Sequence, residues 1–98
     1  MRRALLAALA LAAEVALAQS AAPKGGLVPD AATAVRIAEA VWLPIYGRRI
    51  YEKRPFVAKL QGDIWVVTGT MPKDVLGGVP EAHIAKQDAR VLKVIHGQ

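Results

Sequence analysis

The side chains best suited to metal or acid–base chemistry are two histidines and a glutamate near the C-terminus: His83, His96 and Glu81. If the last two apolar runs form a hairpin with a two-residue loop at Asp88 and Ala89, Glu81 faces His96, and His83 lies within diagonal reach on the same side. Two imidazoles and a carboxylate are a ligand set that zinc accepts. A shift of one residue in the strand pairing would separate them, because side chains alternate between the two faces. A metal protein or small hydrolase is therefore one hypothesis, although it meets only the ligand-type criterion.

A second concentration of functional side chains lies in residues 46–54, where basic and aromatic residues are interleaved. Arginine and tyrosine are enriched at binding hot spots, so this segment is suited to docking an acidic or polyanionic partner. The competing interpretation is a solvated charged loop whose two tyrosines turn into the core. The candidate partner-binding residues are Tyr46, Arg48, Arg49, Tyr51 and, on a later strand, Trp65; Lys53 and Arg54 belong to the same basic cluster.

The sequence contains no catalytic signature. It has no cysteine, no glycine-rich phosphate loop and no His-Glu-x-x-His motif. Asp63, Asp74 and Asp88 fall in expected turns, where aspartate hydrogen-bonds to nearby backbone. We therefore expect a binding protein with no catalytic residues, no metal and no cofactor, and not an enzyme.

The first element that positions these side chains is a helix opened by Asp30, whose carboxylate can accept the free N–H groups of the first turn. Apolar residues then recur at helical spacing and form one broad stripe. Pro44 cannot donate to the preceding turn, so we expect the helix to kink there or to end near Leu43, with Gly47 as its terminator. The stripe comprises Ala31, Ala34, Val35, Ala38, Val41, Trp42 and Ile45.

Four strand-like runs follow the helix and are separated mostly by short turns. Short turns join antiparallel neighbours, so the order predicts an α+β fold with one N-terminal helix packed on a three- to four-stranded antiparallel meander sheet. A further short strand is expected at Ile50 and Tyr51. The main runs are residues 56–60, 64–70, 79–86 and 91–96, with a longer glycine-closed loop at 71–78.

The run at residues 64–67 is apolar at both odd and even positions, so both faces of its strand are hydrophobic. Trp42 is expected in the core because it lies on the helix stripe, whereas either face of the strand could carry Trp65 inward. A single helix covers only one face of a sheet. The other face must meet a second subunit, the linker or a partner protein, since large exposed apolar patches mark interaction sites. A homodimer through the uncovered face is one expectation.

The N-terminus has the features of an export signal. A basic start is followed by a run of Ala, Leu and Val and then by a small-x-small cleavage pattern ending at Ala18, with Ala22 as the second choice for the new N-terminus. Glu14 inside the run departs from this pattern, and an uncleaved N-terminal helix is the alternative. The run is too short to span a bilayer comfortably. We assign residues 1–18 to a signal peptide, 19–29 to a linker rich in Ala, Gly and Pro, and 30–98 to the folded domain.

The chain has 98 residues and a formal net charge of +5 at pH 7. A positive net charge favours anionic partners such as lipid headgroups, cell-wall polymers or an acidic protein. Such a charge also keeps a small protein soluble. Nucleic acid is a poor candidate, because an exported protein rarely meets it. The expected location is the periplasm or cell envelope.

Sequence blocks in order along the exported part resemble bacterial immunity proteins of polymorphic toxin systems that are assigned a nuclear-transport-factor-2-like (NTF2-like) fold. The resemblance implies a reduced NTF2-like or cystatin-like domain that binds a cognate toxin and blocks it. The blocks are Val28-Pro29-Asp30, Ala40-Val41-Trp42, Pro44-Ile45-Tyr46-Gly47, Ile50-Tyr51, Pro55-Phe56, Trp65 with Val67, Gly69-Thr70, Gly77-Gly78, Val91-Leu92 and His96-Gly97.

Two features depart from that family. The last turn has Ala89 where the family pattern has glycine, and if this position is left-handed, alanine costs about 1 kcal/mol. The chain also has one expected helix, where a full NTF2-like domain has several around a curved sheet. The alternative function is an envelope accessory domain that binds cell-wall fragments, a small ligand or an envelope enzyme.

Overall fold

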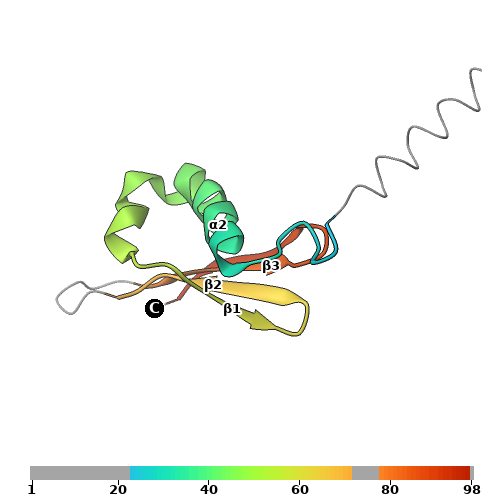
Figure 1. Cartoon of the computed structure of the whole chain (residues 1–98). Coiled ribbons are helices and arrows are strands. Elements are labelled where there is room, and N and C mark those ends of the chain that lie inside the picture. The colour runs from blue at the N-terminus through green and yellow to red at the C-terminus, as the bar shows by residue number, and fades with distance from the viewer. Residues whose placement is uncertain (1–22, 72–77, 98) are drawn as a thin grey trace, which may run out of the picture.

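The computed structural model describes residues 23–71 and 78–97 of the chain. Over these residues, one α-helix packs on one face of an antiparallel sheet with strand order β1-β2-β3-β4 (Figure 1). The predicted α+β meander is confirmed. No helix in this described part is long and apolar enough to cross a membrane. The elements are α2 (Ala31–Tyr46), the 3₁₀ helix η1 (Gly47–Lys53), β1 (Val57–Gln61), β2 (Ile64–Thr68), β3 (Pro80–Ala85) and β4 (Val91–His96).

Some of the sequence-based assignments concern residues outside the described ranges. The assigned signal peptide, residues 1–18, lies outside them, and so does Asp74. The glycine-closed loop is described only at its two ends.

The start of α2 is capped by Asp30. Its Oδ1 atom accepts hydrogen bonds from the backbone N–H of Thr33 at 2.8 Å and from the Thr33 hydroxyl at 2.6 Å. Both hydrogen bonds favour the charged form and hold the pKa of the Asp30 carboxyl below its usual value. The bond from the Thr33 hydroxyl has the larger effect, and the bond from the backbone N–H has the smaller one. The helix start is therefore best stabilised when Asp30 is ionised.

The end of α2 lies three residues beyond Leu43, at Tyr46. Pro44 occupies the last turn, so its missing N–H removes only the hydrogen bond to the carbonyl of Ala40. Gly47 then terminates the helix with φ of 73°, and its N–H donates to the carbonyl of Leu43. The expected end near Leu43 is wrong, whereas the predicted terminator is confirmed.

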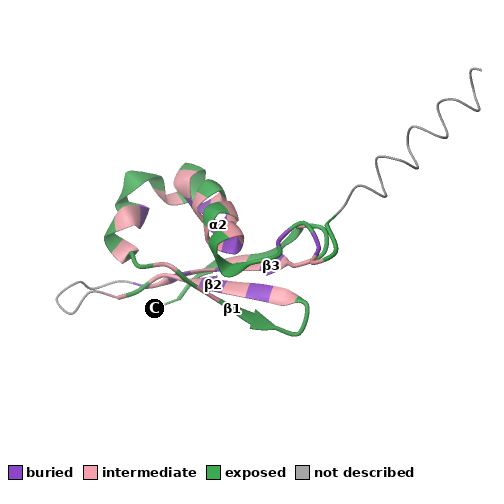
Figure 2. Ribbon diagram, in the orientation of Figure 1, coloured by how far each residue is buried: buried purple, intermediate pink, exposed green. Residues whose placement is uncertain are grey.

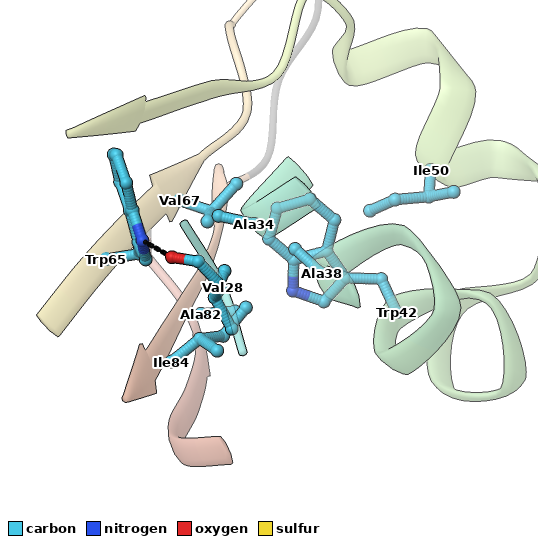
Figure 3. Packing of buried hydrophobic residues seen from close by; sticks show 9 residues of the cluster. All are labelled: Val28, Ala34, Ala38, Trp42, Ile50, Trp65, Val67, Ala82 and Ile84. Carbon is cyan, nitrogen blue, oxygen red and sulfur yellow. Dashed lines mark hydrogen bonds between the residues drawn. The ribbon is translucent and has the colours of Figure 1, made fainter. Parts of the chain in front are cut away.

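The core lies between α2 and the face of the sheet beneath it. Ala34 and Ala38 are small enough for the helix to approach the strands closely, and Trp42 fills the space one turn later. Trp42 also packs edge-on against Phe56, with ring centroids 5.1 Å apart. The prediction that Trp42 belongs to the core is confirmed. The buried cluster comprises Val28, Ala34, Ala38, Trp42, Ile50, Trp65, Val67, Ala82 and Ile84 (Figure 3).

The residues Gly25–Val28, here called the strap, pack against the end of the β3–β4 hairpin. The N–H groups of Leu27 and Val28 donate to the carbonyls of Gln87 and Lys86, each at 3.0 Å. Val28 has no exposed surface. This packing was not expected from the composition of the segment, which is that of a linker.

Two features explain why the strap is rich in glycine. A Cβ atom at Gly26 would lie 2.5 Å from the carbonyl oxygen of Lys86, and Gly26 has φ of 86°. The ammonium of Lys86 contacts the carbonyl of Gly25 in turn. Glycine at position 26 therefore allows the backbone of Lys86 to approach closely and allows a left-handed backbone conformation.

The connection between β3 and β4 is longer than the predicted two-residue loop. The N–H of Ala89 donates to the carbonyl of Ala85 at 3.0 Å, and the N–H of Ala85 donates to the carbonyl of Arg90 at 2.8 Å. Ala89 has φ of 64°, in the left-handed region that glycine adopts at lower cost. Alanine therefore stands at a position where the backbone favours glycine.

The face of the sheet opposite α2 is left open by the other described elements (Figure 1). The register places Val66 of β2 on this face, in a row with Lys59, His83 and Lys93 on the neighbouring strands. The face is thus mixed in character, because an apolar side chain lies in one row with two lysines and a histidine. The homodimer through this face stays a prediction.

Candidate partner-binding surface

The proposed cluster of two histidines and a glutamate does not form. In the β3–β4 pairing, Glu81 lies opposite Ile95 and His83 lies opposite Lys93, one residue away from the predicted register. His96 is therefore on the face toward α2, opposite to that of the other two. The longer loop and a register shift next to His83 cause the difference. Within residues 23–71 and 78–97, no three His, Cys, Asp or Glu side chains are grouped so that they could hold a metal ion.

The pair Glu81–His83 does form on the open face, since residues two apart on a strand share a face. Nε2 of His83 lies 2.6 Å from Oε2 of Glu81. This contact was missed because the prediction joined both residues to His96.

The segment predicted as a short strand at Ile50 and Tyr51 is helical. It belongs to η1, a 3₁₀ helix that follows α2 directly. Ile50 points into the core and is 3% exposed, so it anchors the segment. Tyr46 and Tyr51 are half-buried and pack against the same core. The competing interpretation is confirmed for the two tyrosines, which use part of their rings for packing.

The charged side of η1 faces outward. Arg48 and Arg49 are exposed, and neither forms an ion pair with any residue in the described ranges. Exposed stretches make up much of η1, the segment that follows α2 in the ribbon (Figure 2). Arg54 lies over the Tyr51 ring, with its guanidinium carbon 4.8 Å from the ring centroid, and its Nε donates to the Tyr51 carbonyl at 3.2 Å. The structure thus brings four of the five candidate residues together. We call Tyr46, Arg48, Arg49 and Tyr51 the basic-aromatic surface.

The far end of η1 is braced by the segment that leaves β2. The N–H of Thr70 donates to the carbonyl of Lys53, and its hydroxyl donates to the carbonyl of Pro55, each at 2.7 Å. Nζ of Lys53 also lies 3.7 Å from Sδ of Met71. These contacts fix a charged segment that would otherwise be a free loop, and they were not predicted from sequence.

His96 extends the basic-aromatic surface across to the sheet. Its ring centroid lies 5.5 Å from that of Tyr46, with the ring planes tilted by 41°. The end of β4 therefore meets the end of α2. The observed β3–β4 register explains this contact, because it turns the His96 side chain toward α2. The register predicted from sequence turned it to the other face.

Trp65 is not part of this surface. It is 8% exposed, and its indole N–H donates to the carbonyl of Val28 at 2.8 Å. Figure 3 shows it at the opposite end of the core from Ile50, the residue that anchors η1. This side chain is buried and hydrogen-bonded within the core, so the structure does not place it among the exposed candidate residues. Its role in partner binding stays a prediction.

A family model, described as NTF2 fold immunity protein, matches residues 33–98 of the chain. The chain belongs to this family. No curated protein and no solved structure shows a significant match. The match covers more than half of the chain and includes the end of α2, η1 and the four described strands, so it contains the whole basic-aromatic surface.

Membership of the immunity family fits the arrangement of the side chains. Immunity proteins neutralise toxins and typically do so without catalysis. The described residues of this immunity protein offer an anchored, cationic and aromatic surface. The helix and sheet beneath this surface are consistent with an NTF2-like α+β fold.

Proposed function

We propose that this immunity protein is exported and neutralises a cognate toxin of a polymorphic toxin system by binding it directly, acting as a non-catalytic protein. The observation that carries the proposal is the exposure of Arg48 and Arg49 on a segment held at both ends. Long side chains on an anchored backbone lose less conformational freedom on binding than they would on a loose loop.

The charge and the aromatic side chains of the basic-aromatic surface suggest the chemical character of the toxin surface that it would contact. The two exposed guanidinium groups can bind carboxylates through paired hydrogen bonds, and half-buried tyrosines add rigid apolar contact. The proposed toxin surface is therefore acidic. Binding through such charges weakens as salt is added, because exposed charges are screened within about 10 Å at 0.1 M ionic strength.

Export is supported by the order of features in residues 1–18: a basic start, an apolar run and a small-x-small cleavage pattern. A protein so exported would meet its toxin in the periplasm or at the envelope.

An affinity pull-down tests the proposal. The protein, purified after expression of the full-length chain, is immobilised and exposed to envelope extracts of its own source, and retained proteins are identified by mass spectrometry. The expected result is a stoichiometric partner with a toxin domain. Arg48→Glu combined with Arg49→Glu should lose that partner.

A matched control reverses two exposed charges elsewhere, Arg36→Glu and Lys59→Glu, and changes the net charge by the same amount. It should retain the toxin. Equal retention by the Arg48/Arg49 variant would overturn the proposed surface. Retention of cell-wall fragments or of an envelope enzyme, with no toxin, would instead support an envelope accessory domain.

A further inference from the structure

The outer edge of β4 has features that toxin binding at the basic-aromatic surface does not use. Among the described residues, β4 pairs only with β3, so its other edge has unpaired backbone groups. Three of its apolar side chains are unusually exposed: Val91 at 43%, Leu92 at 47% and Ile95 at 38%. Edge strands of this kind pair readily with another strand.

The pairing with β3 shows which backbone groups point outward. The N–H of Gly97 donates to the carbonyl of Val79 at 3.0 Å. Hydrogen-bonded and non-hydrogen-bonded positions alternate along an antiparallel pair, so Ile95 and Lys93 also bond to β3. Val94 and His96 then direct their N–H and C=O groups to the free edge.

We infer that this edge pairs with β4 of a second copy of the chain, antiparallel and centred on Val94. Centring on Val94 lets the two strands exchange hydrogen bonds through their outward-facing groups. It also places Lys93 opposite the partner's Ile95. Centring on Lys93 would set two ammonium groups directly opposite each other, which is unfavourable.

The charges on the open face favour a second copy over an unrelated strand. Glu81 lies beside Ile95 on the neighbouring strand. The partner's Lys93, on the other side of Ile95, is two strand spacings from Glu81, about 10 Å between Cα atoms. Its long side chain can lie over the exposed Ile95 and reach the carboxylate, whose Oε1 is left available by the contact of Oε2 with His83. The two-fold symmetry of the dimer forms this contact twice.

The dimer joins two four-stranded sheets into one continuous sheet. Because a single short edge buries little surface, the association should be weak, with a Kd in the micromolar range. It is distinct from a homodimer through the open face, where β4 edges would not meet.

Charge reversal tests the ion pairs. In sedimentation velocity over a range of concentrations, Lys93→Glu and Glu81→Lys should each raise the dimer Kd by at least about tenfold, because each sets like charges together. An equimolar mixture of the two variants should dimerise again, since both cross-chain pairs are then restored. This rescue cannot come from a folding defect. A wild-type protein that is monomeric at high micromolar concentration would overturn the inference, and so would a mixture that fails to dimerise.

A cross-link tests the register. The chain has no cysteine, so Val94→Cys provides a single thiol. Hydrogen-bonded antiparallel pairs place Cα atoms about 5.5 Å apart, within the range that a disulfide needs. Mild oxidation should cross-link this variant rapidly, whereas Leu27→Cys, exposed on the strap and away from β4, should not form a disulfide-linked dimer. If the Val94→Cys protein dimerises but does not cross-link, the interface lies elsewhere and the edge pairing is contradicted, while toxin binding is untouched.

Discussion

The indole N–H of Trp65 donates to the backbone carbonyl of Val28, 2.8 Å away, and joins the strap to β2 across 37 residues of sequence. Both residues are buried, so the carbonyl of Val28 has no access to water in place of this bond. The largest side chain of β2 thereby serves to hold the segment that precedes the helix.

Replacing Trp65 with Phe should lower the free energy of unfolding by about 2 kcal/mol, because a buried carbonyl loses its donor and the smaller ring packs less well. Urea denaturation monitored by far-ultraviolet circular dichroism measures the change. Leu27→Ala, at an exposed strap position, is the control and should change stability by less than about 0.5 kcal/mol. Equal stability of the Trp65→Phe variant and the wild type would contradict a structural role for the hydrogen bond.

Ala89→Gly should stabilise the protein. The backbone of Ala89 is left-handed, and relief of its Cβ should add about 1 kcal/mol to the free energy of unfolding. The opposite result is expected for Ala40→Gly on the exposed side of α2. This change should lower the free energy of unfolding by about 1 kcal/mol, because glycine is a poor helix former. Thermal melts of both variants beside the wild type separate the two effects. A destabilised Ala89→Gly protein would show that this turn has no backbone strain to relieve.

Ile50→Ala tests whether η1 is anchored by its single buried side chain. The change removes apolar atoms from the core and should cost about 2 to 4 kcal/mol. Native-state hydrogen exchange should show faster local opening of residues 47–53 than of the strands. Exchange that is unchanged in η1 would mean that the brace at Thr70 alone fixes the segment.

The cap at Asp30 predicts a pH dependence. Its pKa is lowered in the folded protein, so its contribution to stability is complete above the unfolded value of 3.8 and is lost as the pH falls through the folded value. The wild type should therefore exceed Asp30→Ala in stability at neutral pH, and the difference should shrink in acid. Urea melts at several pH values from neutral to below 3.8 give this difference directly. A difference that grows toward acid would contradict the sign of the shift.

The fold was predictable because its elements follow simple patterns. The stripe of α2 repeats at helical spacing, and β4 has the bounds read from its apolar run, Val91–His96. The helical form of Ile50 and Tyr51 was not predictable, because a β-branched residue beside an aromatic one is typical of strands. Its true conformation depends on the core that Ile50 enters.

The candidate site was predictable in composition but only partly in geometry. Tyr46 at the end of α2 and Arg48, Arg49 and Tyr51 of η1 lie within six residues of sequence, so their proximity required no knowledge of the fold. The histidine cluster depended on a strand register, which the longer loop at Ala89 and the irregularity between His83 and Ile84 together changed. The burial of Trp65 was not predictable because its strand is apolar on both faces, and only the position of α2 and the strap decides which face is buried.

The strap also defines where the folded unit starts. A chain that began at Asp30, the first residue of the helix motif, would lack Val28 and leave the indole N–H of Trp65 without its acceptor. It would also expose the end of the β3–β4 hairpin, where Lys86 and Gln87 now accept hydrogen bonds. Any trimming of the N-terminus that preserves the native domain must therefore stop before Gly25, several residues upstream of the point that the helical pattern alone would suggest.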